Sequence, residues 1–349
     1  MSTTQDADRD HLHSLGYAQE LNRGLGTFSN FAISFSIISI LAGGFTSFWL
    51  GAAYGGPLLV TVGWLVVGVF ALCVGMSMGE ICSAYPTAGG LYFWSAKLAT
   101  KNAPMWSWFT GGFNFIGQIG VIASVDYALA NYVVRFINLY SSNPEQPIIE
   151  ERAMNFFIVF LVMLLLHGLL NTFGVKLVRL LGDISVWWHL IGVVVVVAAL
   201  AASSRGDQRG WSHVLDGQAG QLAGWSGRGF VAVYMFAIGL LLAQYTITGF
   251  DASAHVSEET VGASINAPRA MVRSIYISAV AALVLNLAMT KSLPRRADGY
   301  ASVAFGGSGD AFLVNAAPRL FSVAVGPTVA KLLVLISIVA QYFCGLASV

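Results

Sequence analysis

An apolar stretch near the start of the chain, residues 36–49 (SIISILAGGFTSFW), carries the first residues whose types suit chemistry. Ala42, Gly43 and Gly44 stand together in it, with Ser39 about one helical turn earlier. Each glycine costs roughly 1 kcal/mol of helix propensity relative to alanine. Unwound backbone at membrane depth is tolerated only where protein or a water-filled cavity surrounds it. The stretch therefore fits either a broken membrane helix whose opened backbone binds a small molecule, or a small-residue face that a neighbouring helix approaches closely.

A second apolar run is interrupted in a similar way much later in the chain. Thr248 and Gly249 break it, Asp251 follows, and Glu258 and Glu259 lie just beyond. The second break lies five apolar spans after the first. Interrupted spans at corresponding positions in two halves of a chain are the best sequence indication of a transporter site built from inverted repeats. The second break therefore favours the binding interpretation of the first.

Three titratable residues lie within apolar runs: Asp126, His167 and His189. An ionised group at the bilayer centre costs roughly 3 kcal/mol or more, so an acid inside a span usually faces a cavity or a partner. A position of Asp126 near the membrane surface is the alternative, because its span is long. Histidine titrates near physiological pH, which suits proton coupling. A lone histidine in a helix is more often a hydrogen-bonded core residue, so both interpretations stay open.

The composition predicts the environment of these residues. The chain has 349 residues, of which 56% are hydrophobic and 10% charged, whereas ordinary soluble proteins carry about 25% charged residues. Apolar runs of ~20 residues, long enough to cross a bilayer core, recur along the chain. We therefore expect an all-α polytopic membrane protein in a lipid bilayer. The net charge of +1 indicates no nucleic-acid partner, and the three cysteines lack metal-ligand spacing, so we expect no metal and no cofactor.

The apolar runs predict about eight spans. They cover residues 28–50, 57–79, 106–137, 153–173, 184–202, from 229 into 244–260, 272–290 and 326–349. We expect residues 1–26 to be a polar tail and residues 27–349 to form the transmembrane domain. Arg9 and Arg23 in the tail favour a cytoplasmic N-terminus. The last span is still apolar where the chain stops, which leads us to expect a truncated form of a longer protein.

A semi-polar connection follows the second span. It holds Glu80, Pro86, Gly89 and Gly90. Proline prevents the helix from continuing, and glycine permits a turn with positive φ. We expect a turn and a short amphipathic segment at the cytoplasmic face, with a gating or structural role and no contact with substrate.

Three long stretches also carry a family pattern. They are FSNFAISFSIISILAGG in the first span, GEICSAYPTAGGLYFWSAKLA after the second and TGFDASAHVSEETVGASINAPRAM after the sixth, and QYFCGLASV in the eighth fits as well. With them the chain resembles amino acid permeases of the amino acid–polyamine–organocation superfamily, most closely the amino acid/choline/GABA permease branch. The resemblance covers nearly the whole chain. It implies an inverted five-plus-five repeat of the leucine-transporter type, with discontinuous spans 1 and 6 and, here, an incomplete second repeat.

The resemblance also implies site residues. Backbone N–H groups of the opened first span suit a substrate carboxylate, and the residues placed there are Ser39, Ala42, Gly43 and Gly44. Carbonyl groups of the opened sixth span suit the ammonium, and the residues at that break are Tyr245, Thr246, Thr248 and Gly249. For Tyr245 a core aromatic with a satisfied hydroxyl is the alternative.

Coupling and gating residues follow in the same way. Some members of the superfamily carry a proton-coupling lysine in the fifth span, and His189 falls near that place. Glu258 and Glu259 match the family's inner-gate segment, although adjacent glutamates more often form a solvated face. Asp251 is a gating candidate, with a solvated helix-end residue as the simpler interpretation.

These observations predict a secondary transporter and not an enzyme. It would move amino acids or related amines across the plasma membrane by alternating access, with protons as the expected coupling ion. The first break offers no acidic side chain, which favours neutral amino acids or GABA-like substrates. The chain has no GxxxxGK[ST] loop that would support coupling to ATP. Two alternatives stay open: a channel, and a truncated membrane protein that has a structural or regulatory role and does not transport.

Overall fold

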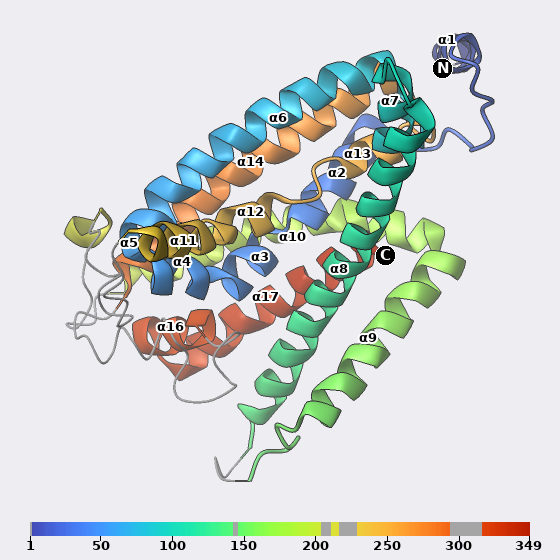
Figure 1. The fold of residues 1–349 in the computed structure, drawn as a ribbon. Coiled ribbons are helices and arrows are strands. Elements are labelled where there is room, and N and C mark those ends of the chain that lie inside the picture. The colour runs from blue at the N-terminus through green and yellow to red at the C-terminus, as the bar shows by residue number, and fades with distance from the viewer. Residues whose placement is uncertain (1, 142–145, 204–210, 216–228, 294–315) are drawn as a thin grey trace.

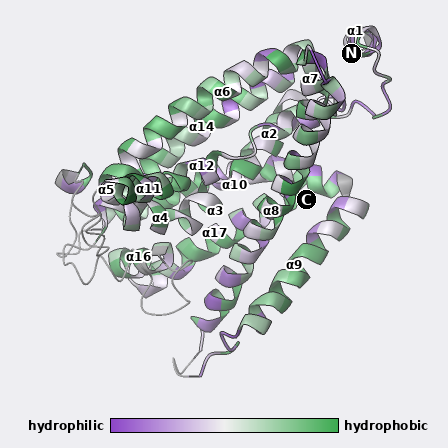
Figure 2. Ribbon diagram, in the orientation of Figure 1, coloured by the Kyte–Doolittle hydropathy of each residue, from purple (hydrophilic) through white to green (hydrophobic). Residues whose placement is uncertain are grey.

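The computed structural model is helical in all regular elements that it describes (Figure 1). It describes residues 2–141, 146–203, 211–215, 229–293 and 316–349. Within them, eight helices or consecutive helix segments are long and apolar enough to cross a membrane. This confirms the predicted all-α polytopic fold. Figure 2 shows hydrophobic residues along these spans, whereas α1 (Ser2–Ser14) is hydrophilic.

The first half of the chain contains five spans. The first consists of α2 (Thr27–Ile38) and α3 (Ile40–Thr46), and the short α4 (Phe48–Tyr54) follows it. The second joins α5 (Gly56–Leu58), the π-helix η1 (Leu59–Gly63) and α6 (Trp64–Ala84). The short α7 (Gly90–Leu98) then leads to the long α8 (Ala103–Asn138). The fourth and fifth spans are α9 (Ala153–Phe173) and α10 (Val175–Ala202).

The described residues of the second half contain three spans. A 3₁₀ turn, η2 (Trp211–His213), precedes the sixth. That span is divided into α11 (Phe230–Gly239), α12 (Leu241–Ile247) and α13 (Ala252–His255). The seventh is α14 (Ala263–Lys291), and α16 (Ala316–Val325) precedes the eighth, α17 (Pro327–Ser348).

Two spans begin earlier than the hydropathy pattern predicts. The fifth starts at Val175 instead of residue 184, and the seventh starts at Ala263 instead of residue 272. Hydropathy detects only the part of a helix that lies in lipid, whereas the backbone hydrogen bonds of a helix continue into its polar ends. Most residues between the fifth and sixth spans, and between the seventh and eighth, fall outside the described residues.

The broken first span lies at the centre of the bundle. In its most apolar window 78% of residues are buried, compared with 6% in α9, which lies at the periphery. Its small polar residues bind the sixth span: the Ser34 hydroxyl donates to the Phe250 carbonyl at 2.9 Å, and the Asn30 amide donates to the Ser253 carbonyl at 3.1 Å. Buried polar groups require such partners. These bonds place the two interrupted spans side by side.

Candidate functional site

The first span breaks at Ser39, which has left-handed backbone angles (φ 33°, ψ 82°) between α2 and α3. Its carbonyl accepts hydrogen bonds from the N–H groups of Ala42 and Gly43, at 3.0 and 2.9 Å. The expectation of an opened backbone at the glycine pair is therefore wrong: Gly43 and Gly44 are helical residues of α3. The break lies about one turn earlier, at Ser39, which the sequence analysis placed among the residues that bind the substrate carboxylate.

Packing explains Gly43. A Cβ atom there would lie 2.9 Å from both Cα and Oγ1 of Thr246 in α12, closer than real contacts allow. Only glycine lets α3 and α12 approach in this way. The neighbouring Gly44 is less confined, because the nearest atom to its Cβ position is Leu285 Cδ2 at 3.9 Å. The first span therefore has both a break, at Ser39, and a close contact with a neighbouring helix, at Gly43.

The sixth span breaks where the sequence predicts. Helix α12 ends at Ile247, Thr248 is extended (φ −66°, ψ 145°), and Gly249 has φ +98°. Side chains rarely adopt such an angle. A Cβ on Gly249 would also overlap Cγ2 of Ile37 in α2. Glycine is therefore required twice here, by its own backbone and by the contact between the two broken spans.

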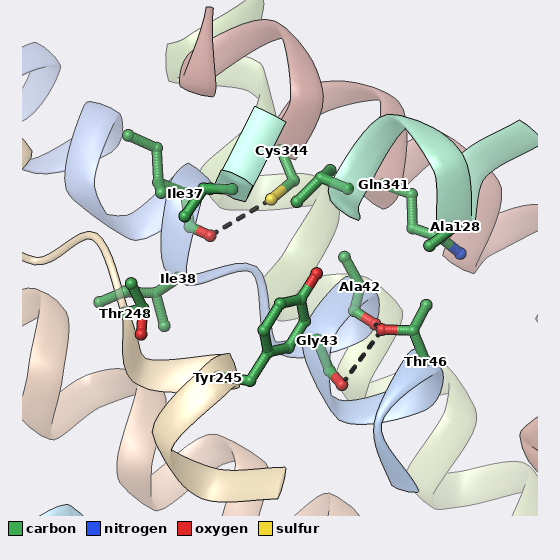
Figure 3. A pocket seen from close by; sticks show the side chains of 12 residues that line it. Ile37, Ile38, Ala42, Gly43, Thr46, Ala128, Tyr245, Thr248, Gln341 and Cys344 are labelled. Carbon is green, nitrogen blue, oxygen red and sulfur yellow. Dashed lines mark hydrogen bonds between the residues drawn. The ribbon is translucent and has the colours of Figure 1, made fainter. Parts of the chain in front are cut away.

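A cavity of about 30 Å³ lies between the two breaks (Figure 3). One water needs roughly 10–15 Å³ measured in this way, so this conformation encloses space for about two waters and none for an amino acid. The lining residues come from spans 1, 3, 6 and 8: Ile37, Ile38, Ala42, Gly43, Thr46, Val121, Val125, Ala128, Tyr245, Thr248, Gln341 and Cys344. Four of the eight predicted substrate residues line it.

The other four predicted substrate residues lie behind this lining. Ser39 and Gly44 are buried in the first span, and Thr246 is buried against Gly43. Gly249 lines a second cavity, described below. Figure 3 shows the ring of Tyr245 projecting from α12 into the first cavity, and its hydroxyl hydrogen-bonds with Ser124 Oγ at 3.2 Å. Tyr245 is therefore both a cavity residue and a satisfied core aromatic.

Residues of α8 and α17 line the same cavity and were not predicted. The clearest is Cys344, whose thiol donates to the Ile37 carbonyl at 3.2 Å, at the end of α2 (Figure 3). Gln341 lies one turn earlier on the same helix and also faces the cavity. Both lie in the QYFCGLASV stretch that fits the family pattern, but the sequence does not indicate what they contact, because that depends on how the eighth span packs on the first.

A wider cavity of about 460 Å³ lies beyond Ile37, which lines both cavities. Asp251 and His255 line it, with 3.6 Å between Asp251 Oδ2 and His255 Nε2, and Asn114 Nδ2 lies 3.4 Å from the same nitrogen. Asp251 therefore faces a cavity and has a partner. His255 was missed, although its position four residues after Asp251 places both on one helix face. The contact of Ile37 with Gly249 separates the two cavities.

His189 lies at the first break, in contact with Ser39. Its Nε2 is 2.7 Å from the Ser39 hydroxyl, and its Nδ1 is 2.8 Å from the Ser185 carbonyl. A carbonyl only accepts, so a neutral His189 carries its proton on Nδ1 and accepts from Ser39 at Nε2. The fully buried ring thereby fixes the hydroxyl of the residue at which the helix opens. The sequence placed His189 near the position of a proton-coupling lysine in the fifth span, and the structure brings it into contact with Ser39.

Glu258 binds the residues before the first span. Its Oε1 accepts the backbone N–H groups of Glu20 and Leu21, at 2.7 and 3.0 Å, and it is 1% exposed. Arg23 donates to the Thr260 carbonyl at 2.6 Å in the same region. The interpretation of Glu258 as a solvated face is therefore wrong, because the chain before the first span covers it. Glu259 is only partly buried, and burial and then the charge of Glu258 raise the pKa of its carboxyl. The raised pKa stabilises the folded state at low pH. This stabilisation is lost as the pH rises through the pKa of the folded state.

The connection after the second span reaches the sixth span as well. Gly90 has φ +46°, as expected for the turn, and a Cβ there would lie 2.9 Å from the His255 ring. Pro86 is buried and Gly89 is partly buried in this turn. Glu80 is exposed near the end of α6 and lines neither of the two cavities. The turn thus contacts α13, whereas Glu80 lies outside both the turn and the two cavities.

We expect Glu258→Ala to release the segment that precedes the first span. The change leaves two backbone donors without their buried acceptor, at a cost of about 1–3 kcal/mol. Hydrogen–deuterium exchange of residues 17–25 should therefore become faster by about tenfold or more. Glu259→Ala is the matched control and should change this exchange little. Equal exchange in Glu258→Ala and the unchanged protein would contradict the assignment.

The amino acid permease family model matches residues 25–348, which is nearly the whole chain. The chain belongs to the amino acid permease family. Members of this family are transporters, so the comparison also confirms the expectation that the chain is not an enzyme.

Individual relatives agree with this family. Amino-acid permease BAT1 of Arabidopsis thaliana is 41% identical over 279 residues, covering 78% of this chain and 52% of the relative. Its homolog in Oryza sativa subsp. japonica is 37% identical over 360 residues, covering 99% and 65%. The GABA-specific permease of Saccharomyces cerevisiae is 27% identical over 274 residues, covering 77% and 46%. This permease-family chain thus spans between about half and two thirds of the length of the relatives it matches.

Proposed function

We propose that this chain forms the substrate-binding part of a secondary transporter for amino acids or related amines. The observation that carries the proposal is the meeting of two interrupted spans around one cavity. Helix α3 begins beside it and α12 ends beside it, so the end of one helix at which backbone N–H groups point outward and the end of the other at which carbonyl groups do so lie at the same place. These groups complement the carboxylate and the ammonium of a zwitterion.

In this proposal the substrate site is the cavity between the breaks, enlarged by movement of its walls. The predicted residues Ala42, Gly43, Tyr245 and Thr248 would touch substrate. Ser39, Gly44, Thr246 and Gly249 would shape the backbone around it. The cavity residues on α3 and α12 carry no ionisable group other than the phenol of Tyr245, which supports neutral amino acids or GABA-like substrates over cationic ones.

Alternating access would use the thin partition at Ile37 and Gly249. The wider cavity on one side of it would be the route to one membrane face, and the polar group of Asp251, His255 and Asn114 would line that route. Arg9 and Arg23 support a cytoplasmic location for this end of the bundle, at the plasma membrane. Uptake coupled to protons completes the proposal, and His189 stays a coupling candidate through its contact with Ser39.

Uptake into proteoliposomes tests this function. The purified protein is reconstituted, an outside-acid pH gradient is imposed, and labelled GABA, alanine and arginine are offered separately. We expect saturable uptake of GABA or alanine that a protonophore reduces. No uptake and no exchange of any of the three would reject transport by this chain and favour a structural role. Flux that does not saturate would favour a channel.

A further inference from the structure

A buried acid and a buried histidine meet between α8, α9 and α17. The distance between Asp126 Oδ1 and His167 Nδ1 is 3.0 Å, and neither side chain has any exposed surface. They come from consecutive spans, and each was noted in the sequence without a partner. Asp126 does not line the two cavities described above. The sequence left two interpretations of Asp126 open: a partner or cavity inside the span, or a position near the membrane surface. The structure agrees with the first, because Asp126 has a buried partner.

The eighth span closes the space around this pair. A Cβ on Gly345 would overlap Asp126 Oδ1 and lie 2.6 Å from His167 Cε1. The ring of Tyr342 packs on His167, with 4.7 Å between ring centroids. Asn171 holds α9 to α17, because its amide donates to the carbonyls of His167 and Leu346, each at 3.0 Å. The pair is therefore held by three helices and shielded from water.

The charge of the pair depends on a single proton. Within the described residues, the only ion pair of Asp126 is with His167, and neither carboxylate oxygen has a well-aligned hydrogen-bond donor. With one proton shared between the two groups the net charge is zero. Without it the pair carries one negative charge that no cation offsets. A lone buried charge costs several kcal/mol, so loss of the proton favours conformations that admit water or separate the helices.

The other titratable groups near the pair do not offset its negative charge. From α17, Tyr342 faces His167, and Cys344 lies within electrostatic range of Asp126. Beyond Cys344 come Ser39 and then His189 of α10. Phenols and thiols have ordinary pKa values of about 10 and 8.5, both above neutral pH, and His189 reaches the pair only through Ser39 and Cys344.

The pair lies directly behind the wall of the substrate cavity. Val125 precedes Asp126 on α8, Cys344 precedes Gly345 on α17, and both preceding residues line that cavity. A change of separation between α8 and α17 at the pair therefore changes the cavity itself. Proteins amplify such small shifts because packed interfaces have discrete arrangements.

We propose that Asp126 and His167 together form a proton-binding site that couples proton uptake to the opening and closing of the substrate cavity. The site takes one proton from water on one side of the membrane and releases it on the other. The coupling rests on the proposed transport function, whereas the existence of the proton site does not. The two parts are therefore tested separately.

Infrared difference spectra of the purified protein in D₂O, recorded across a pH series, test the proton site. In His167→Gln the carboxyl of Asp126 loses its partner, and its carboxylic-acid C=O band should be stronger than in the unchanged protein at the same pH, because a lone buried charge is costly. The double variant His167→Gln with Asp126→Asn should lack that band. Spectra of His167→Gln that match the unchanged protein throughout the series would overturn the proposed site.

Gly345→Ala offers the same test without removing either titratable group. The added methyl forces the pair apart, so its spectrum should change in the direction of His167→Gln. Gly120→Ala on α8 is the matched control, since nothing lies within 4 Å of its Cβ position, and its spectrum should not change. An unchanged spectrum in Gly345→Ala would count against the described contact.

Transport tests the coupling. Proteoliposomes with Asp126→Asn should retain exchange of labelled GABA or alanine without a pH gradient, and should lose accumulation driven by the gradient by about tenfold or more. Accumulation that is retained in Asp126→Asn would overturn the coupling and leave the proposed transport intact. If the unchanged protein transports neither compound, the proposed function fails, while the spectra still decide whether the proton site exists.

Discussion

Gly43→Ala should reduce uptake to background, whereas the neighbouring Gly44→Ala should leave it near the level of the unchanged protein. The methyl group on residue 43 would meet the backbone of Thr246 at 2.9 Å, and backbone yields less easily than a side chain. Helices α3 and α12 would have to separate. The start of α3 and the end of α12, which the proposed site needs side by side, would then also move apart. Overpacking of this kind costs about 1–3 kcal/mol of stability.

The matched pair makes this prediction sharp, because the two glycines are adjacent, buried and helical. Gly44 has its nearest contact at 3.9 Å, so alanine fits, and its higher helix propensity offsets part of any cost. Thermal unfolding in detergent measures the stability of each variant, and uptake of labelled GABA and alanine measures function. Equal behaviour of the two variants in both assays would show that the close contact with Thr246 does not decide the role of Gly43.

Gly249→Ala is expected to have the second large effect. Its φ of +98° is unfavourable for any side chain, and the added Cβ would overlap Ile37 Cγ2 in α2. Both penalties act at the partition between the two cavities. We expect loss of uptake together with a loss of stability of about 2–5 kcal/mol, the sum of backbone strain and overpacking.

Gly229→Ala is the control that separates the two causes. Gly229 also has positive φ (+70°), precedes the first helix of the same span, and has nothing within 4 Å of its Cβ position. The control therefore carries backbone strain without a collision. It should lower stability by only about 1–2 kcal/mol and retain uptake. If Gly229→Ala and Gly249→Ala lose uptake equally, the contact with Ile37 is not the reason for the glycine.

These two variants and the proton site concern one group of helices. Span 1 is the common element: α3 contacts α12 through Gly43, α2 contacts Gly249 through Ile37, and Ser39 between them contacts His189. Span 8 reaches the same place through Cys344, and its Gly345 lies against the Asp126–His167 pair of spans 3 and 4. Movement of α17 would therefore alter the proposed substrate cavity and the proposed proton site together.

Several features of this protein follow from sequence alone, because their causes are local. Apolar runs of ~20 residues are sufficient to predict helices that cross a bilayer, and the eight spans are confirmed. The break at Gly249 was predicted correctly, since a Thr-Gly step followed by an acid ends an apolar helix without help from distant residues. The turn at Gly90 was predicted for the same kind of reason, from proline and glycine chemistry.

Other features depend on which helices meet. Sequence placed the first break at Gly43 and Gly44, because glycine disfavours helix; the structure places it at Ser39, since the helical Gly43 serves the contact with Thr246, more than 200 residues away in the chain. The partners of Asp126 and Glu258 were equally hidden, because a side chain alone does not specify what packs against it. Propensity and hydropathy act over one or two helical turns, whereas close packing and buried charge pairing act between spans. Tertiary structure alone therefore decided which of these residues share a site.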